Sequence, residues 1–183
     1  MPKLILITGG ARSGKSSYAL KLAKTQSRKV VYIATATPLD SEMRKRIKLH
    51  RKLRRKNWIT IEEPIDILSA VKRTSTRKTV IILDCLTLLI SNLMLKGFSD
   101  NVIYNKIKTI VKALKANAQA SIVVTNEIGS GIVPDNKLAR RFRDIQGCVN
   151  QLVSEEAERV YLLVSGIPVK IKGGRSNVER IGE

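Results

Sequence analysis

Residues 4–16 read LILITGGARSGKS, a short apolar run that passes directly into a glycine-rich segment. The segment fits the pattern G-x-x-x-x-G-K-[S/T] of a phosphate-binding loop, and it lies where that motif requires, between an expected strand and an expected helix. The candidate nucleotide-binding residues of this loop are Gly9, Gly10, Ala11, Arg12, Ser13, Gly14, Lys15 and Ser16. We therefore expect a P-loop protein that binds the phosphates of ATP or GTP.

The last two residues of the loop have distinct chemical roles. A bent glycine-rich backbone and the following helix N-terminus point N–H groups at phosphate oxygens. Lys15 then neutralises charge on the β- and γ-phosphates, and the Ser16 hydroxyl ligates Mg²⁺. Lys15 is accordingly a catalytic candidate and Ser16 a metal-ligand candidate, with a ligand-free tight turn as the alternative interpretation.

The rest of the chain alternates between apolar runs and helical patterns. The runs typical of buried strands are Leu4–Thr8, Val30–Ala34, Val80–Asp84, Ser121–Asn126 and Val160–Ser165, with further extended pieces at Trp58–Ile61 and Val169–Lys172. The expected helices are Ser16–Thr25, Asp40–Arg55, Ile65–Lys72, Leu86–Lys96, Asn101–Asn117 and Lys137–Glu156. Such alternation predicts an α/β, P-loop NTPase-like fold, with a mostly parallel sheet and helices on both faces. We expect a single catalytic domain over residues 1–172 and a polar tail over 173–183.

Each apolar run ends in small or polar residues. Examples are Thr8-Gly9, Asp84 and Thr125-Asn126-Glu127. In an open α/β sheet the ligand lies beyond the carboxyl ends of the strands, so these segments are expected to converge on one site.

The composition fits a basic protein without membrane spans. There are 34 Lys and Arg residues against 15 Asp and Glu, a formal net charge of +19. Such a surface attracts polyanions, although a general bias toward lysine gives the same composition. The longest apolar stretch, Val80–Leu95, is interrupted by polar residues, and the two cysteines, Cys85 and Cys148, have no metal-ligand spacing. We expect a cytoplasmic protein with reduced thiols.

Asp84 ends the apolar run Val80–Leu83. A carboxylate at that place resembles a Walker B residue, which holds Mg²⁺ directly or through water, so Asp84 is a candidate for metal and nucleotide binding. The alternative is that Asp84 caps the helix expected from Leu86.

The only histidine lies in a strongly basic helical segment. His50 follows Arg46 by four residues and Ile47 by three, so all three share one side of the expected helix. Neighbouring cations disfavour protonation of the imidazole, which leaves a nitrogen lone pair for attack on phosphorus. His50 and Arg46 are therefore catalytic candidates, and an inert surface histidine on a solvated helix is the alternative.

Together these segments resemble the bifunctional adenosylcobinamide kinase/adenosylcobinamide-phosphate guanylyltransferase family of cobalamin biosynthesis. The resemblance extends from Leu4 to about Lys172. The matching segments are Thr8–Ser16, Tyr32–Thr35, Glu42-Met43, Arg46-Ile47, His50, Trp58, Glu62–Pro64, Asp84–Thr87, Asn92-Leu93, Thr125–Gly129, Gly131–Pro134, Asn136–Arg140, Phe142–Asp144 and Val164–Lys170. The Thr-Asn-Glu-Ile-Gly segment and the histidine are more specific to the family than the P-loop is.

The resemblance implies a kinase that phosphorylates adenosylcobinamide and then transfers GMP from GTP to that phosphate. The family's guanylylated histidine falls at His50, and Mg²⁺ with ATP or GTP is implied as cofactor and substrates. Glu63 joins the nucleotide-binding candidates by the same resemblance. Further candidates are Glu127, Arg140 and Arg143, for which a loop-ordering role or local ion pairs are the alternatives. The resemblance also implies a homo-oligomer, a trimer, and predicts no specific nucleic-acid partner.

Two other functions fit parts of the sequence. The first is another P-loop small-molecule kinase without a covalent step, in which His50 is incidental. The second is a basic nucleic-acid-binding NTPase, suggested by the charge of +19, although aromatic residues for base stacking make up only 4% of the chain.

Overall fold

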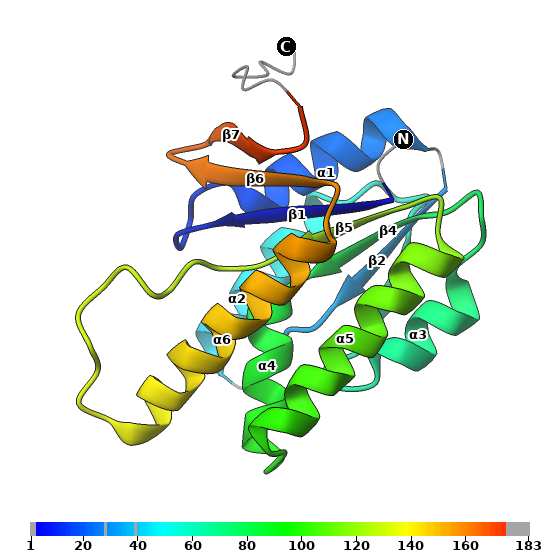
Figure 1. The fold of residues 1–183 in the computed structure, drawn as a ribbon. Coiled ribbons are helices and arrows are strands. Elements are labelled where there is room, and N and C mark those ends of the chain that lie inside the picture. Colours follow the sequence, from blue (N-terminus) through cyan, green and yellow to red (C-terminus); the bar gives the residue numbers. More distant parts are fainter. Residues whose placement is uncertain (1–2, 28, 39, 175–183) are drawn as a thin grey trace.

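The computed structural model describes residues 3–27, 29–38 and 40–174, and its fold is drawn in Figure 1. The expected polar tail over 173–183 lies outside the described residues from 175 onward. No helix of the described ranges is long and apolar enough to cross a bilayer.

The described chain forms one seven-stranded sheet. Its strands are β1 (Leu4–Gly9), β2 (Val30–Ala34), β3 (Ile59–Glu62), β4 (Val80–Asp84), β5 (Ala120–Val124), β6 (Arg159–Val164) and β7 (Ile167–Lys172). Their order across the sheet is β3-β2-β4-β5-β1-β6-β7, and every neighbouring pair is parallel except β6 with β7. The prediction of a mostly parallel sheet is confirmed, and each expected strand is present within one or two residues of its expected bounds.

Helices cover both faces of this sheet, as predicted (Figure 1). They are α1 (Lys15–Gln26), α2 (Ser41–Lys52), α3 (Ile67–Thr74), α4 (Leu86–Leu95), α5 (Asp100–Asn117) and α6 (Lys137–Glu156). Side chains alternate along each strand, so Ile5 and Ile7 pack with α1 while Leu4 and Leu6 pack with the helices of the opposite face. The aliphatic composition of the strands suits burial on both faces.

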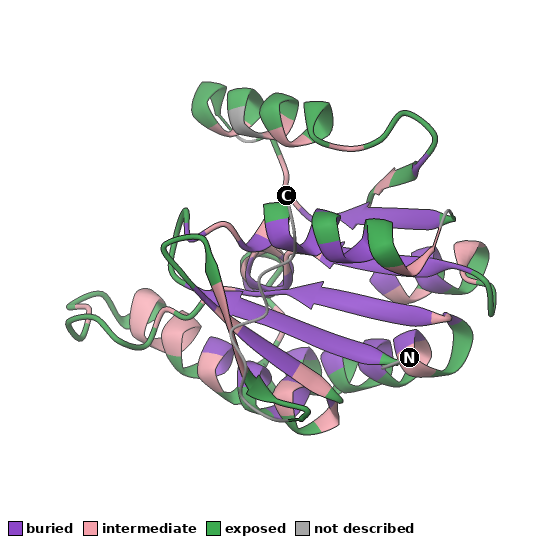
Figure 2. Ribbon diagram, turned by 90° about the horizontal axis from the view of Figure 1, so that it is seen from above, coloured by how far each residue is buried: buried purple, intermediate pink, exposed green. Residues whose placement is uncertain are grey.

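Helix α2 is the exception to this close packing. None of its described residues is buried, and Figure 2 shows it standing off from the sheet at the top of the view. Its sequence explains this, because the helix is rich in Lys and Arg and offers only a narrow apolar stripe. The helix is shorter than the predicted Asp40–Arg55, since Asp40 is its N-cap and Leu53 its C-cap.

Candidate functional site

The P-loop joins β1 to α1 in a conformation that depends on glycine. Gly9 has φ +147° and Gly14 has φ +94°, both in the region that side chains rarely adopt. A Cβ atom on Gly9 would lie 2.5 Å from the Leu163 carbonyl oxygen. Gly14 is the N-cap of α1, and its carbonyl accepts a hydrogen bond from Tyr18 N at 2.9 Å. The loop therefore presents the N-terminus of α1 to solvent, which is the geometry that binds phosphate.

Lys15 is buried at the start of α1, with 7% of its surface exposed. Its ammonium group donates to the carbonyl of Gly10 and lies 3.4 Å from the Ser13 hydroxyl oxygen. The lysine thus folds back across its own loop. The positive charge lies where the loop would enclose phosphate oxygens.

One cavity of about 610 Å³ connects the P-loop with segments distant in sequence. The P-loop contributes the run from Arg12 to Ser17, the strand ends contribute Ala34, Asp84, Val124 and Asn126, and α2 contributes the far wall. The strand ends therefore meet at one site, as their polar endings predicted.

His50 lies on the wall of this cavity that α2 forms. Met43, Ile47, His50 and Arg54 all line the cavity, at the spacing of one helix face. His50 is partly buried, while Leu49 and Leu53, which also line the cavity, stay more than half exposed. Arg46 lies on the same helix, but its side chain is outside the described part of the structure. The sequence prediction that His50 and the P-loop share a site agrees with this placement.

Asp84 lines the cavity at the end of β4. It is not the cap of the next helix, because Cys85 is the N-cap of α4 and its Sγ accepts from Leu88 N at 3.5 Å. The Thr35 hydroxyl fixes the turn between Asp84 and α4, since it accepts from Cys85 N at 2.8 Å and donates to Cys85 O at 2.7 Å. The capping alternative for Asp84 is therefore wrong, and the carboxylate is left for other partners.

The partner that the structure gives Asp84 is Tyr32. The Tyr32 hydroxyl donates to Asp84 Oδ2 from the adjacent strand β2. Burial, with the neighbouring Asp84 charge, raises the pKa of Tyr32 well above its usual range, so the phenol stays protonated. On the ring face, the Arg54 guanidinium carbon lies 3.8 Å from the ring centroid. Sequence reasoning missed both Tyr32 and Arg54.

The oxygen donors around the P-loop fit Mg²⁺ bound together with a nucleotide. Ser16 and Asp84 both line the cavity, and hydroxyl and carboxylate oxygens are the ligands that this hard cation prefers. Within the described ranges, no group of three or more His, Cys, Asp or Glu residues is placed to hold a metal ion. Mg²⁺ would therefore take its remaining ligands from phosphates and water, which is its usual mode in such sites.

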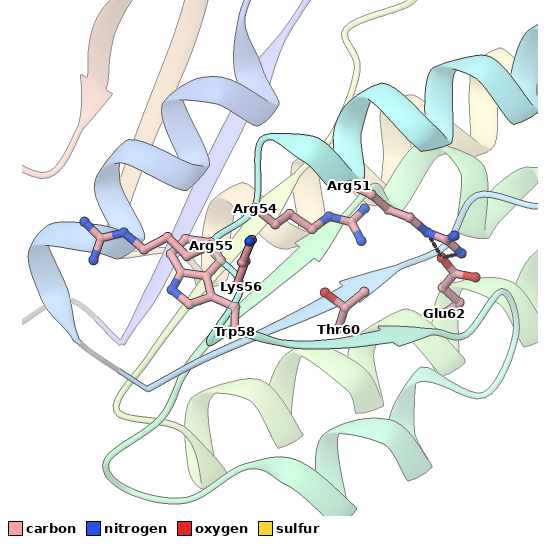
Figure 3. A pocket seen from close by; sticks show the side chains of 7 residues that line it. All are labelled: Arg51, Arg54, Arg55, Lys56, Trp58, Thr60 and Glu62. Atoms are coloured by element: carbon pink, nitrogen blue, oxygen red, sulfur yellow. Dashed lines mark hydrogen bonds and ion pairs between the residues drawn. The ribbon is translucent and has the colours of Figure 1, made fainter.

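Glu63 lies outside the cavity lining, and its neighbour Glu62 lies within it. The Glu63 carboxylate accepts from Ile65 N at 3.0 Å and Asp66 N at 2.9 Å, so it orders the turn before α3. Glu62 instead pairs with Arg51 from α2. This pair separates the main cavity from a second, open cavity of about 590 Å³, shown in Figure 3, where Arg54 extends from the end of α2 toward Arg51.

The three further candidates lie outside the cavity lining. Glu127 is exposed; its backbone N donates to the Gly9 carbonyl at 3.0 Å. Arg140 donates to the carbonyls of Pro134 and Asp135, and Arg143 lies 4.0 Å from an Asp144 oxygen. Direct phosphate binding by these residues stays a prediction.

A buried polar network holds the end of β5 beside the P-loop. The Gln146 amide donates to the Thr125 hydroxyl at 2.9 Å and to Asn150 Oδ1 at 2.7 Å. Asn150 Nδ2 in turn donates to the Asn126 carbonyl at 3.0 Å. Because these groups satisfy one another away from water, they fix Asn126 in the cavity wall.

The two cysteines are free thiols. Burial raises the pKa of Cys85 to about 12, which keeps this thiol protonated and unreactive beside the site. Cys148 is exposed on α6, away from the residues that line the cavity.

Comparison with known proteins assigns the chain to a family. The family described as "Cobinamide kinase / cobinamide phosphate guanyltransferase" matches residues 5–171. The "Bifunctional adenosylcobalamin biosynthesis protein CobU" of Escherichia coli K12 is 40% identical over 181 residues, which cover 92% of this chain and 99% of that protein. The corresponding CobP protein of Pseudomonas aeruginosa is 38% identical over 168 residues, covering 92% and 96%.

Solved structures of low identity support the fold alone. The structure of an isolated ATPase domain matches with a TM-score of 0.54 at 14% identity, over 96% of this chain and 79% of that one. An ATPase of a bacterial type III secretion system matches with a TM-score of 0.55 at 10% identity, over 88% and 51%.

Proposed function

The chain belongs to the cobinamide kinase / cobinamide phosphate guanyltransferase family, and from that premise we propose a division of labour between the P-loop and His50. The enzyme phosphorylates adenosylcobinamide with a nucleoside triphosphate. It then transfers GMP from GTP to adenosylcobinamide phosphate. Family membership favours this function over a plain small-molecule kinase or a nucleic-acid-binding NTPase.

The observation that carries the proposal is the single cavity that contains both the P-loop and His50. In the kinase step, the N–H groups of the loop and Lys15 bind the phosphates and stabilise the charge that develops on the γ-phosphoryl group. The acceptor is the hydroxyl of the cobinamide side arm. This step needs no imidazole.

In the guanylyl transfer, the neutral imidazole of His50 attacks the α-phosphorus of GTP. A P–N bond forms, the bond from that phosphorus to the bridging oxygen breaks, and pyrophosphate leaves. A phosphate oxygen of cobinamide phosphate then attacks the same phosphorus. The P–N bond breaks, the imidazole is regenerated and the GDP-linked product leaves.

The surrounding residues supply charge and orientation for both steps. Ser16 and Asp84 would hold Mg²⁺, which neutralises phosphate charge when it is bound. Arg46 is proposed to assist charge development at the α-phosphate, because it precedes His50 by one helical turn. The expected homo-oligomer, a trimer, and a cytoplasmic location complete the proposal, with residues 1–172 as its catalytic domain.

Labelling with GTP that carries ³²P at the α-position tests the covalent step. We expect the wild-type protein to retain label on a denaturing gel with release of pyrophosphate, and His50→Ala to retain none. The label should be lost in acid and kept in alkali, since protonation of the nitrogen makes it a leaving group. His50 is the only histidine, so no second imidazole replaces it.

Kinase turnover of the same His50→Ala protein is the internal control, and it should persist because the P-loop is intact. Label that persists in His50→Ala would contradict the assignment and favour a plain kinase.

A further inference from the structure

Tyr32 is a buried side chain that the proposed mechanism has not used. It is 2% exposed, lies on β2 and packs in the apolar cluster shared with α1. Its neighbours in the sheet register are Ile82 of β4 and Thr60 of β3. A ring so enclosed has one available orientation, so its hydroxyl is a fixed hydrogen-bond donor.

The hydroxyl meets the carboxylate that lines the nucleotide cavity. It donates to Oδ2 of Asp84, two residues further along the adjacent strand than the register partner of Tyr32. Hydrogen bonds to a charged acceptor are stronger than neutral ones, and this bond is shielded from bulk water by the sheet. The terminal torsion of an aspartate is otherwise broad, so a fixed donor selects one orientation of the carboxylate.

Arg54 holds the ring from its other side. Its guanidinium carbon lies 3.8 Å from the ring centroid, a distance typical of a cation–π contact. Arg54 Nε and Nη1 are buried and have no hydrogen-bond partner among the described residues, so the ring is the contact that seats this group. Arg54 follows His50 by four residues, which places the Tyr32 ring between Asp84 and the end of α2.

We propose that Tyr32 is a positioning residue for the nucleotide transfers, whose hydroxyl sets the orientation in which the Asp84 carboxylate meets Mg²⁺ and the bound nucleotide. This inference rests on the role proposed above for Asp84. The residue acts through Asp84 and does not touch the substrate. Without the hydroxyl, the carboxylate samples several orientations, and Mg²⁺ must select the productive one at a cost in affinity.

Tyr32→Phe removes the hydroxyl and keeps the ring, so packing and the Arg54 contact are retained. The matched control is Tyr161→Phe, which makes the same change in the same apolar cluster, on β6 and outside the cavity lining. The probe is GTP with a methylene bridge between the α- and β-phosphates, because this analogue cannot load His50. Calorimetric titration gives its affinity with and without Mg²⁺ for each variant.

For Tyr32→Phe we expect the Mg²⁺ concentration for half-maximal tightening of analogue binding to rise about tenfold, as for the loss of one hydrogen bond to a charged group. Binding without Mg²⁺ should match wild type, and Tyr161→Phe should match wild type in both conditions. Thermal unfolding of each variant separates this effect from a loss of fold. A Tyr32→Phe titration that superimposes on wild type would overturn the proposal, as would an equal loss of affinity with and without Mg²⁺.

Asp84→Asn separates this inference from the function on which it rests. If Tyr32 acts through the carboxylate, Tyr32→Phe should have no further effect on Mg²⁺ dependence in the Asp84→Asn background. Additive effects would contradict the inference. If Asp84→Asn alone leaves the Mg²⁺ titration unchanged, the proposed role of Asp84 fails, and the inference about Tyr32 fails with it. A changed Asp84→Asn titration with an unchanged Tyr32→Phe titration overturns the Tyr32 inference alone.

Discussion

Lys15 shows how a single residue is prepared for phosphate. Its ammonium group already contacts the Gly10 carbonyl and lies near the Ser13 hydroxyl, so the charge is held by the loop before a ligand arrives. Exchange of these contacts for phosphate oxygens needs little movement of the side chain. Such preorganised charge stabilises a transition state without reorganisation during the reaction.

The first prediction at this scale concerns Lys15→Ala. We expect kinase turnover to fall by about a hundredfold, because the variant lacks a charge that the transition state requires. The fold should persist, as judged by its thermal unfolding. Lys21→Ala, an exposed lysine on the same helix, is the matched control and should keep full turnover. Steady-state kinetics of Lys15→Ala that equal those of the control would remove the lysine from the mechanism.

Residues whose roles follow from a local pattern were predicted from the sequence. The P-loop, Asp84 at a strand end and His50 on a basic helix all belong to this group. Tyr32 does not, because its partner Asp84 lies 52 residues away and the pairing depends on strand order. No local signal distinguishes Tyr32 from an ordinary core residue in the apolar run Val30–Ala34.

The placement of Glu62 and Glu63 shows a second limit of sequence reasoning. Successive residues at a strand end point in opposite directions, so only one of two adjacent glutamates faces the cavity. The sequence favoured Glu63 through family resemblance, but Glu62 lines the cavity and Glu63 orders the turn before α3. Which one faces inward is decided by the register of β3 against β2, which a single sequence does not reveal.

Helix α2 is the least anchored of the described helices. The other helices each bury several residues against the sheet, whereas α2 buries none of its described residues. Elements with few buried contacts open most readily, so His50 lies on a part of the fold with low local stability. The helical pattern was predictable from the sequence, but its detachment was not, because a basic helix of this composition also fits a close-packed amphipathic position.

A prediction at this scale concerns the cap of α2. The Asp40 carboxylate accepts a hydrogen bond from Met43 N at 2.7 Å, so Asp40→Ala should destabilise the first turn by about 1 kcal/mol. Because α2 carries His50 and little else holds it, labelling by GTP should slow up to about fivefold while kinase turnover is retained. The ratio of the two rates in one preparation is the measurement.

Asp66→Ala is the matched control for this variant. Asp66 caps α3 in the same manner, through a hydrogen bond from Ser69 N at 3.2 Å, but α3 carries no residue of the cavity lining. The control should therefore leave the ratio of labelling to kinase rates unchanged. Equal slowing of both activities in Asp40→Ala would show that α2 stability does not limit guanylylation.

The charge of the whole molecule acts on folding and on binding in opposite directions. Even if every acidic side chain were paired, nineteen positive charges would remain on a chain of 183 residues. Their mutual repulsion destabilises the compact state, while the same field attracts nucleoside triphosphates and pyrophosphate toward the cavity. The lysines and arginines of α2 place part of this charge beside the nucleotide site.

The last prediction therefore concerns salt. Raising KCl from about 20 mM to about 200 mM shortens the Debye length from roughly 20 Å to below 10 Å, which screens the repulsion between exposed cations. The melting temperature of the ligand-free protein should rise by about 2–4 °C, the shift that corresponds to about 1 kcal/mol in a domain of this size. Over the same range the affinity for GTP should fall, because screening also weakens the attraction of an anionic ligand. Chloride is the anion of choice, since sulfate and phosphate would occupy the P-loop and stabilise the fold by binding. A melting temperature that falls with added KCl would contradict self-repulsion as a determinant of stability, and it would indicate that ion pairs across the surface outweigh the excess positive charge.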